Sequence, residues 1–190
     1  HAMQKITIRD IQKFKDQRTP FATVTAYDYV SARIADAVEI PLLLVGDSAA
    51  MVVYGMDTTI PISMEEMIFL VRAVCRGSNK SLVVADMPFM SYQTSVEDAV
   101  RNAGRFVKEG GAEAVKLEGG RAYTAQIKAI IDAGIPVIGH IGLLPQSFHL
   151  SSGYRIQGKT KLEAEKILTD AMAVQDSGSF SIVLEGMPAN

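Results

Sequence analysis

The sequence predicts an α/β fold built on a parallel β-sheet, and two features of the chain carry this prediction. Short apolar runs alternate with amphipathic stretches along the whole chain, which is the pattern of repeated β–α units. The apolar runs are continuous rather than interleaved with polar residues, as is typical of parallel strands buried on both faces. Repeated β–α units leave two architectures, an open doubly wound sheet or a (βα) barrel.

Apolar runs that are rich in β-branched residues give the strands. We expect strands over residues 22–26, 42–45, 82–85, 114–117, 137–139 and 181–184, with a helix before them over about residues 7–17. No Gly-x-Gly-x-x-Gly or Walker pattern follows any of these runs. Its absence weakens a nucleotide-binding version of the open sheet.

The helices between the strands have readable beginnings and ends. Ser63 and Glu66 have the spacing of a capping box, and Thr94 and Glu97 repeat it before the next apolar stripe. Glycines at 110–111 predict the end of that second helix.

A last helix and two loops complete the organisation. An apolar stripe between residues 162 and 174 predicts a helix that stops near Gly178. The segments 50–62 and 143–160 are long and contain Gly and Pro, so we expect functional loops over a site. No linker or change of composition divides the chain, so residues 1–190 are expected to form a single domain.

Composition and charge exclude several classes of protein. The chain is 48% hydrophobic and 21% charged, as in ordinary soluble globular proteins. Its net charge of −2 provides no basic field for nucleic acid. The single cysteine, Cys75, rules out an intramolecular disulfide and fits a reducing, cytosolic setting. No apolar run approaches the length of about 20 residues that spans a membrane, so no membrane partner is expected.

Every predicted strand brings an ionisable side chain to its carboxyl end or just beyond it. In chain order these are Tyr27 and Asp28, Asp47, Asp86, Lys116 and Glu118, His140, and Glu185. The carboxyl ends of parallel strands lie on one face, where ligands bind in both competing architectures. Buried carboxylates are unfavourable there unless they are paired, hydrogen-bonded or metal-bound.

Each of these residues also has a purely structural explanation. Asp28 fits the N-terminal cap of a helix that starts near residue 30. Asp47, Asp86 and Glu118 fit turn residues. Lys116 fits a side chain that extends to solvent, and His140 fits a hydrogen-bonded core residue. These explanations do not account for the repetition at the same end of every strand.

Asp47, Asp86 and Glu118 occur without a Cys cluster or a His pair, which favours an oxygen-binding divalent cation over zinc or copper. Mg²⁺ keeps open or water-filled positions that a bidentate 2-oxo acid could fill. The cation would then polarise the keto oxygen, stabilise an enolate and acidify the neighbouring carbon. A separate carboxylate on the sixth strand could act as the base.

Seven motifs stand in order along the chain. They are TAYD (25–28), LVGDS (44–48), ADMPFMSY (85–92), VKLEGG (115–120), GHIGLLPQS (139–147), GYRIQGK (153–159) and VLEGMP (183–188). Together they resemble the ketopantoate hydroxymethyltransferase (3-methyl-2-oxobutanoate hydroxymethyltransferase) family from about residue 5 to the last residue. The resemblance implies a (βα)₈ TIM barrel of the phosphoenolpyruvate/pyruvate-binding type, of which this chain covers about the first six strands.

The resemblance also implies an activity. Members of the family transfer a hydroxymethyl group from 5,10-methylenetetrahydrofolate to 3-methyl-2-oxobutanoate and so make 2-dehydropantoate for pantothenate and coenzyme A biosynthesis. The reaction depends on Mg²⁺ and passes through a metal-stabilised enolate. The expected partners are therefore a small 2-oxo acid and a folate, and the expected state is a cytoplasmic homo-oligomer, commonly a decamer.

By the family pattern, Asp47, Asp86 and Glu118 are the Mg²⁺ site, with the two aspartates as the direct ligands. Glu185 matches the catalytic base, which removes the C3 proton of the oxo acid. These roles come from the resemblance and place the chemistry at the predicted strand ends.

The remaining roles concern the substrate. The implied substrate-binding residues are Asp47, Ser48, Asp86 and Lys116. Ser48 would hold the carboxylate of the oxo acid, and Lys116 would offset negative charge on the enolate. His140 and Tyr27 would support the site.

One difference separates this chain from a full barrel of the family. A (βα)₈ barrel has eight strands and about 250 residues, whereas this sequence of 190 residues reaches the sixth strand and lacks the last two strands and the C-terminal helices. The sequence is either part of a longer chain or a true truncation. A truncation would leave two open sheet edges, and we expect it to be poorly stable or to aggregate, without turnover.

Two other functions stay open. Another Mg²⁺-dependent barrel enzyme on 2-oxo acids, such as a carbon–carbon lyase of the isocitrate lyase or phosphonomutase kind, would also bind an enolate at strand ends. Those lyases carry a nucleophilic cysteine on a loop, whereas Cys75 lies in a helical apolar stripe and fits the core. An inactive remnant that only binds a partner is the second alternative, and the retention of every acidic strand end disfavours it.

Overall fold

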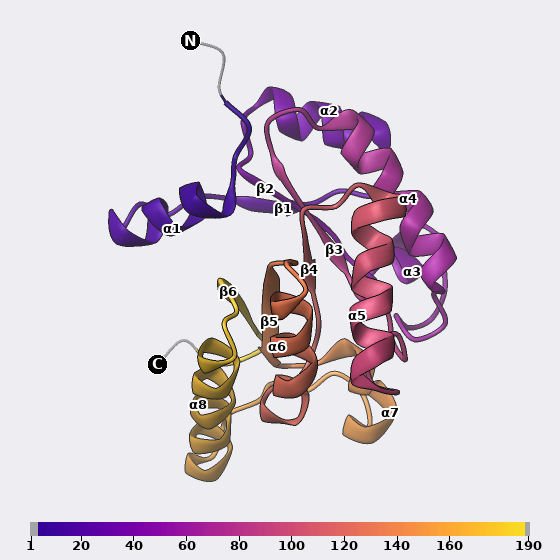
Figure 1. Ribbon diagram of the computed structural model, residues 1–190. Helices are drawn as coiled ribbons and strands as arrows, with labels where there is room; N and C mark the ends of the chain where they lie inside the picture. The colour runs from indigo at the N-terminus through magenta and orange to yellow at the C-terminus, as the bar shows by residue number, and fades with distance from the viewer. Residues whose placement is uncertain (1–3, 189–190) are drawn as a thin grey trace.

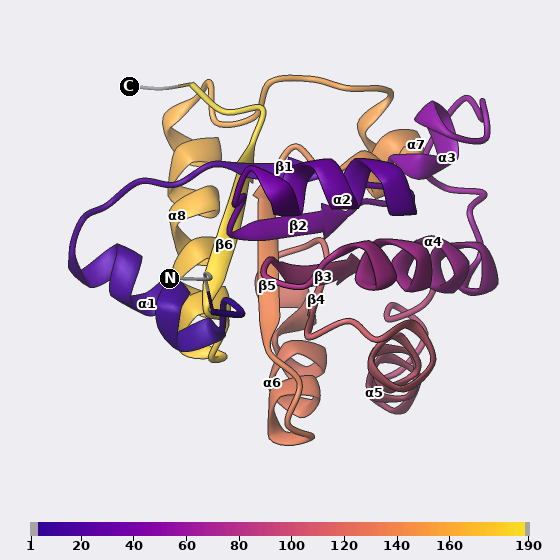
Figure 2. The ribbon, with the colours of Figure 1, turned by 90° about the horizontal axis from the view of Figure 1, so that it is seen from above.

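Six parallel strands lie side by side in chain order in the computed structural model, which describes residues 4–188 (Figure 1). They are β1 (Thr23–Thr25), β2 (Leu42–Val45), β3 (Leu82–Asp86), β4 (Ala114–Lys116), β5 (Val137–Gly142) and β6 (Ser181–Glu185). Each strand pairs only with its neighbours in sequence, and the sheet curls as it proceeds (Figure 2). This order is that of a barrel, because a doubly wound sheet reverses its strand order at a switch point.

Helices connect the strands and cover the outer face of the sheet. They are α2 (Tyr29–Ala37), α3 (Ala49–Val52), α4 (Met64–Gly77), α5 (Val96–Arg105), α6 (Thr124–Asp132), α7 (Phe148–Ser151) and α8 (Lys161–Asp176). The first helix, α1 (Ile8–Asp16), lies across the sheet from α4 and α5 (Figure 1). No helix between residues 4 and 188 is long and apolar enough to cross a membrane.

Successive residues of each strand face opposite sides of the sheet, and two separate cores result. Leu43 and Val83 belong to the outer core, which packs against the covering helices. Leu42 and Leu82 belong to the inner core on the concave side, to which α1 contributes Ile11. The inner core therefore closes the amino end of the concave face.

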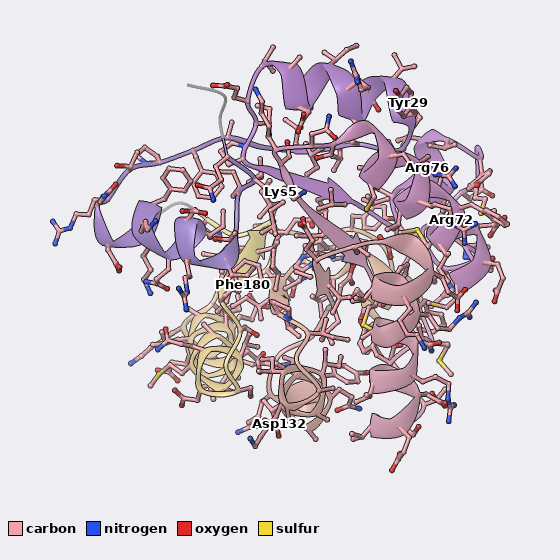
Figure 3. All side chains as sticks on the ribbon, turned by 45° about the horizontal axis from the view of Figure 1, so that its top comes forward. Lys5, Tyr29, Arg72, Arg76, Asp132 and Phe180 are labelled. Carbon is pink, nitrogen blue, oxygen red and sulfur yellow. The ribbon has the colours of Figure 1, made fainter. Side chains whose placement is uncertain are left out.

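The N-terminal segment is tied to that same end. Lys5 donates from Nζ to the backbone oxygen of Ser81 at 2.6 Å and lies 3.1 Å from the carboxylate of Glu113. Figure 3 labels Lys5 near the middle of the molecule, whereas Tyr29, Arg72 and Arg76 lie on the outer helices α2 and α4. The segment before α1 thus bridges the beginnings of β3 and β4.

The predicted caps are confirmed for one helix and wrong for the next. Ser63 and Glu66 form the expected capping box at the start of α4. At the start of α5 the cap is Ser95 and not Thr94, because the Ser95 hydroxyl accepts from the backbone N–H of Asp98 at 3.0 Å. Thr94 instead donates to the Asp98 carboxylate at 2.8 Å.

The predicted ends of two helices are confirmed. After α5 the chain continues through one π-helical turn, Phe106–Gly110, and stops at Gly111, whose φ of 84° is in the left-handed region. Helix α8 ends at Asp176, just before Gly178, whose φ is 100°. Glycine adopts such angles without the steric strain that a side chain would cause.

The two edge strands are more exposed than the strands between them. β1 is exposed along its length and β6 is mostly half-buried, whereas β3 is buried throughout. Apolar side chains are also exposed beside these edges, including Val30 and Ile34 on α2, Leu168 on α8 and Leu184 on β6. The sheet is therefore a partial barrel of six strands that is open between β1 and β6.

A hollow lies in this open region, at the amino end of the concave face. It has a volume of about 750 Å³ and is lined by side chains of α1, the segment before β1, α8 and β6, including Phe14, Phe21 and Phe180. Figure 3 labels Phe180 where α8 leads into β6. No carboxylate lines the hollow, so it is separate from the predicted chemistry.

Candidate active site

The concave face changes from apolar to polar along each strand. On β3, Val84 belongs to the inner core and Asp86, two residues later, faces the same side at the carboxyl end. The same step of two residues leads from Ala114 to Lys116, from Ile138 to His140 and from Val183 to Glu185. A period of two along the strands therefore brings the predicted polar residues to one end of one face.

Two carboxylates and one ammonium form the buried centre of the site. Asp86 accepts a hydrogen bond from Lys116 Nζ at 2.6 Å through Oδ1, and one from the backbone N–H of Asp47 at 3.0 Å through Oδ2. The side chains of Lys116 and Asp86 are only 4% and 3% exposed. Burial raises the pKa of Asp47 to about 9, and the negative charge of Asp86 adds to this increase. The site thus gathers more buried carboxyl groups than one ammonium can offset in their ionised form.

His140 lies between two further carboxylates. Its Nδ1 is 3.8 Å from Oε1 of Glu118, and its Nε2 is 3.2 Å from Oε2 of Glu185. Burial raises the pKa of Glu118, whereas the polar contact with His140 lowers the pKa of Glu185. The side chain of Glu185 is 43% exposed and that of Glu118 is 3% exposed. Glu185 is therefore the ionised and accessible carboxylate of the two, which suits a proton acceptor.

Tyr27 and Ser48 lie together at the β1 side of the site. The Tyr27 hydroxyl is 2.7 Å from Ser48 Oγ. Gly46 makes room for this arrangement, because a Cβ at that position would lie 2.9 Å from Ser48 Oγ. Asp28 does not join them: its carboxylate accepts from the backbone N–H of Ser31 at 2.8 Å and caps α2. The structural explanation of Asp28 is confirmed.

Two residues without a predicted role connect the site. Gln146 donates from Nε2 to Asp47 Oδ2 at 2.8 Å and from its backbone N–H to Glu118 Oε2 at 3.1 Å. The Tyr92 hydroxyl is 2.8 Å from Gln146 Oε1 and accepts from the backbone N–H of Glu118 at 3.1 Å. Both residues lie in the motifs GHIGLLPQS and ADMPFMSY. Neither side chain is charged at neutral pH, so the pattern of charged residues at strand ends does not indicate them.

The two loops that were predicted to be functional meet near these residues. Segment 50–62 begins within α3, and segment 143–160 contains η3 (Pro145–Ser147) and α7. The Tyr154 hydroxyl is 3.8 Å from Met51 Sδ. Burial raises the pKa of Tyr154, and the negative charges of Asp47, Glu118 and Glu185 add to this increase. Segment 143–160 therefore reaches over the carboxylates.

The donor set suits a divalent cation held by few protein ligands. Among residues 4–188, no three His, Cys, Asp or Glu side chains are gathered so that they could hold a metal ion together. Asp47 and Asp86 lie side by side, and a bound cation would stabilise the ionised form of their buried carboxyl groups. One or two carboxylates are the usual protein share for Mg²⁺, which otherwise keeps water and substrate oxygens. Direct ligation by Glu118 stays a prediction.

Sequence comparison relates nearly the whole chain to one enzyme family. A family profile described as ketopantoate hydroxymethyltransferase matches residues 5–190. The 3-methyl-2-oxobutanoate hydroxymethyltransferase of Carboxydothermus hydrogenoformans is 54% identical over 187 residues, which cover 98% of this chain and 68% of that protein. The enzyme of the same name from Thermobifida fusca is 51% identical over 188 residues, covering 99% and 67%. The chain thus spans about two thirds of the length of these relatives.

Solved structures share the fold at much lower identity. A 2,3-dimethylmalate lyase, described as a PEP mutase/isocitrate lyase superfamily member, gives a TM-score of 0.69 at 17% identity and covers 95% of this chain and 62% of that chain. A phosphonopyruvate hydrolase in complex with oxalate and Mg²⁺ gives 0.71 at 13% identity, covering 95% and 64%. This chain spans less than two thirds of either structure. The similarity confirms the barrel class and carries no further conclusion about activity.

Proposed function

The chain belongs to the ketopantoate hydroxymethyltransferase family, a family of transferases, and we propose that it transfers a hydroxymethyl group to 3-methyl-2-oxobutanoate. The proposed donor is 5,10-methylenetetrahydrofolate, the proposed cofactor is Mg²⁺, and the product is 2-dehydropantoate. Because the chain spans about two thirds of its relatives' length, the activity of the whole protein is part of this proposal.

The observation that carries the proposal is the pairing of two unlike acidic groups on one face. Asp47 and Asp86 form a buried pair of acidic side chains. Glu185 is a half-exposed carboxylate whose pKa is lowered. A cation site and a separate base are the two parts that removal of a proton beside a keto group needs.

Asp47 and Asp86 would hold the cation, and Glu118 would add negative charge beside them. When bound, Mg²⁺ polarises the keto group of the oxo acid and makes its C3 proton more acidic. Burial acts to lower the pKa of Lys116, but the negative charges of Asp86 and Glu118 raise it above its ordinary value. Lys116 therefore stays an ammonium that can offset negative charge growing on the substrate.

Ser48 and Glu185 would act on the two ends of the substrate. The Ser48 hydroxyl, oriented by Tyr27, would donate a hydrogen bond to the substrate carboxylate. Glu185 would take the C3 proton, and His140 at 3.2 Å would hold its carboxylate in place. Such positioning gives the carboxylate one reactive orientation toward the substrate.

The setting of the enzyme is proposed from the family resemblance alone. We expect a cytoplasmic homo-oligomer, commonly a decamer, with a folate site beside the oxo acid. A carbon–carbon lyase is not favoured, because Cys75 lies within α4 and burial raises its pKa to about 11. Such a thiol is a poor nucleophile at neutral pH.

Calorimetric titration with 3-methyl-2-oxobutanoate, with and without Mg²⁺, tests the cation site and the substrate together. We expect binding only with Mg²⁺, and formation of 2-dehydropantoate once methylenetetrahydrofolate is added. Equal binding without Mg²⁺ would contradict the cation site. Cleavage of a 2-oxo acid without folate would favour a lyase instead.

A further inference from the structure

We infer that Gln146 is a positioning residue that orients the carboxylates of Asp47 and Glu118 for the cation. The inference rests on the proposed Mg²⁺ site and adds a residue to it. Gln146 lies in η3, directly after β5, and is 5% exposed. Within residues 4–188, Gln146 alone hydrogen-bonds both the carboxylate of Asp47, which follows β2, and the carboxylate of Glu118, which follows β4.

The side-chain amide of Gln146 has one possible orientation. Its Nε2 donates to Asp47 Oδ2 at 2.8 Å and to the backbone oxygen of Met87 at 2.9 Å. Its Oε1 is 2.8 Å from the Tyr92 hydroxyl and accepts from Gln93 Nε2 at 3.1 Å. A carboxamide has two donor hydrogens and two acceptor positions, and all are used. Reversing the amide would set its oxygen against the backbone carbonyl oxygen of Met87, which can only accept.

The backbone of Gln146 adds a contact that no substitution of its side chain removes. Its N–H donates to Glu118 Oε2 at 3.1 Å, so one residue binds one oxygen of each of two carboxylates. The second oxygen of Asp47, Oδ1, is left to face the cation, and the second oxygen of Glu118, Oε1, lies 3.8 Å from His140 Nδ1. The two carboxylates come from segments far apart in the chain, and Gln146 fixes their relative placement.

A neutral amide is the suitable donor for this task. A lysine or arginine at this position would neutralise Asp47 and compete with the cation, as Lys116 already neutralises part of the charge of Asp86. An amide donates hydrogen bonds without cancelling the charge, so Asp47 keeps its affinity for a metal. Loss of a residue that hydrogen-bonds a metal ligand typically lowers metal affinity by about 10- to 100-fold.

The test is the substitution Gln146→Met, which keeps the length of the side chain and removes its donors. We expect Mg²⁺ to bind about 10- to 100-fold more weakly by calorimetry. Exchange of the C3 proton of 3-methyl-2-oxobutanoate with D₂O should return to the wild-type rate once Mg²⁺ is saturating. A residue that serves folding alone would lower the melting temperature and leave the Mg²⁺ affinity unchanged.

Asn102→Leu is the matched control. It removes a side-chain amide that donates to the backbone oxygen of Ser91 at 2.7 Å, and Asn102 lies on the outer helix α5. We expect lower stability with the wild-type Mg²⁺ affinity. Should Gln146→Met not fold, Gln146→Asn serves instead, because its shorter side chain keeps the amide but withdraws it from Asp47.

The outcomes separate the inference from the proposed function. Unchanged Mg²⁺ affinity in a folded Gln146 variant would overturn the role of Gln146 while the cation site stands. Failure of the wild-type protein to bind Mg²⁺ would overturn the cation site itself. Weaker Mg²⁺ binding in both Gln146 variants, with the control unchanged, supports the inference.

Discussion

At the amino end of the concave face, Leu42, Leu82 and Ala114 pack with Ile11 of α1 in an apolar core. At the carboxyl end of the same strands, and on the same face, the buried side chains are charged, with Asp86 and Lys116 in contact at 2.6 Å. The side chains are buried at both ends, but they are apolar at the amino end and charged at the carboxyl end. Apolar burial stabilises the fold, whereas buried carboxylates destabilise it unless something offsets their charge.

This contrast indicates that the carboxyl end of the strands carries the function. The raised pKa of Asp47 shows that its carboxylate is held where ionisation is unfavourable. Proteins tolerate such arrangements where activity requires them and compensate elsewhere in the structure. The apolar core at the amino end can supply the stability that the buried carboxylates cost. Mutations at the two ends should therefore have different effects on stability and on binding.

The largest expected effect is loss of the cation site. Asp47→Ala or Asp86→Ala should abolish Mg²⁺-dependent binding of 3-methyl-2-oxobutanoate, measured by calorimetry, because each removes a carboxylate from the buried pair. Asp28→Ala is the matched control, since Asp28 also follows a strand but caps α2. It should lower stability by about 1 kcal/mol without changing binding. Binding that survives in the Asp47 and Asp86 variants would remove the functional contrast between the two ends.

A second substitution separates chemistry from binding at the carboxyl end. Glu185→Gln keeps the shape of the side chain and removes the base. The rate of C3 proton exchange in D₂O, followed by NMR, should fall by about 10²- to 10⁴-fold. The affinity for the oxo acid with Mg²⁺ should stay near that of the wild type. Exchange at the normal rate would show that another group removes the proton.

The amino end should show the reverse behaviour. Leu82→Ala removes a buried side chain of the inner core and should lower the free energy of unfolding by about 2–5 kcal/mol, measured by urea denaturation. The Mg²⁺ affinity of the folded variant should not change. Weaker Mg²⁺ binding in a folded Leu82→Ala protein would mean that the two ends are coupled.

Stability should also depend gradually on pH. The pKa of Asp47 is raised from 3.8 to about 9, so the folded protein keeps a proton that the unfolded chain has released. The free energy of unfolding of the metal-free protein should therefore decline as pH rises from about 4 to about 9. Asp47→Asn should flatten this decline, as followed by thermal melts. An equal slope in the variant would assign the decline to other groups.

Much of the fold could be predicted, because continuous apolar runs and capping residues are local signals. Position in the sequence did not distinguish Asp28 from Asp47, since both follow a strand. Both also precede a helix, and the distinction lies in the side chains: that of Asp28 is exposed and caps α2, whereas that of Asp47 is buried and accepts a hydrogen bond from Gln146. Likewise, the choice of Ser95 over Thr94 as a cap depends on backbone angles that two adjacent hydroxyl residues do not reveal.

The connecting residues of the site could not be predicted in the same way. Gln146 acts on Asp47 across 99 positions of sequence, and it does so through the orientation of a neutral amide. Nothing in the local pattern around Gln146 indicates that contact. Charged residues at strand ends can be recognised from the sequence. The neutral groups that hydrogen-bond them can be recognised only from the structure.

A crystal structure of the protein with Mn²⁺, as an anomalous scatterer in place of Mg²⁺, and 3-methyl-2-oxobutanoate tests the site most directly. We predict an anomalous peak between the carboxylates of Asp47 and Asp86, with the C3 atom of the oxo acid facing Glu185. A metal bound elsewhere, or an oxo acid whose C3 atom faces away from Glu185, would contradict the proposed chemistry.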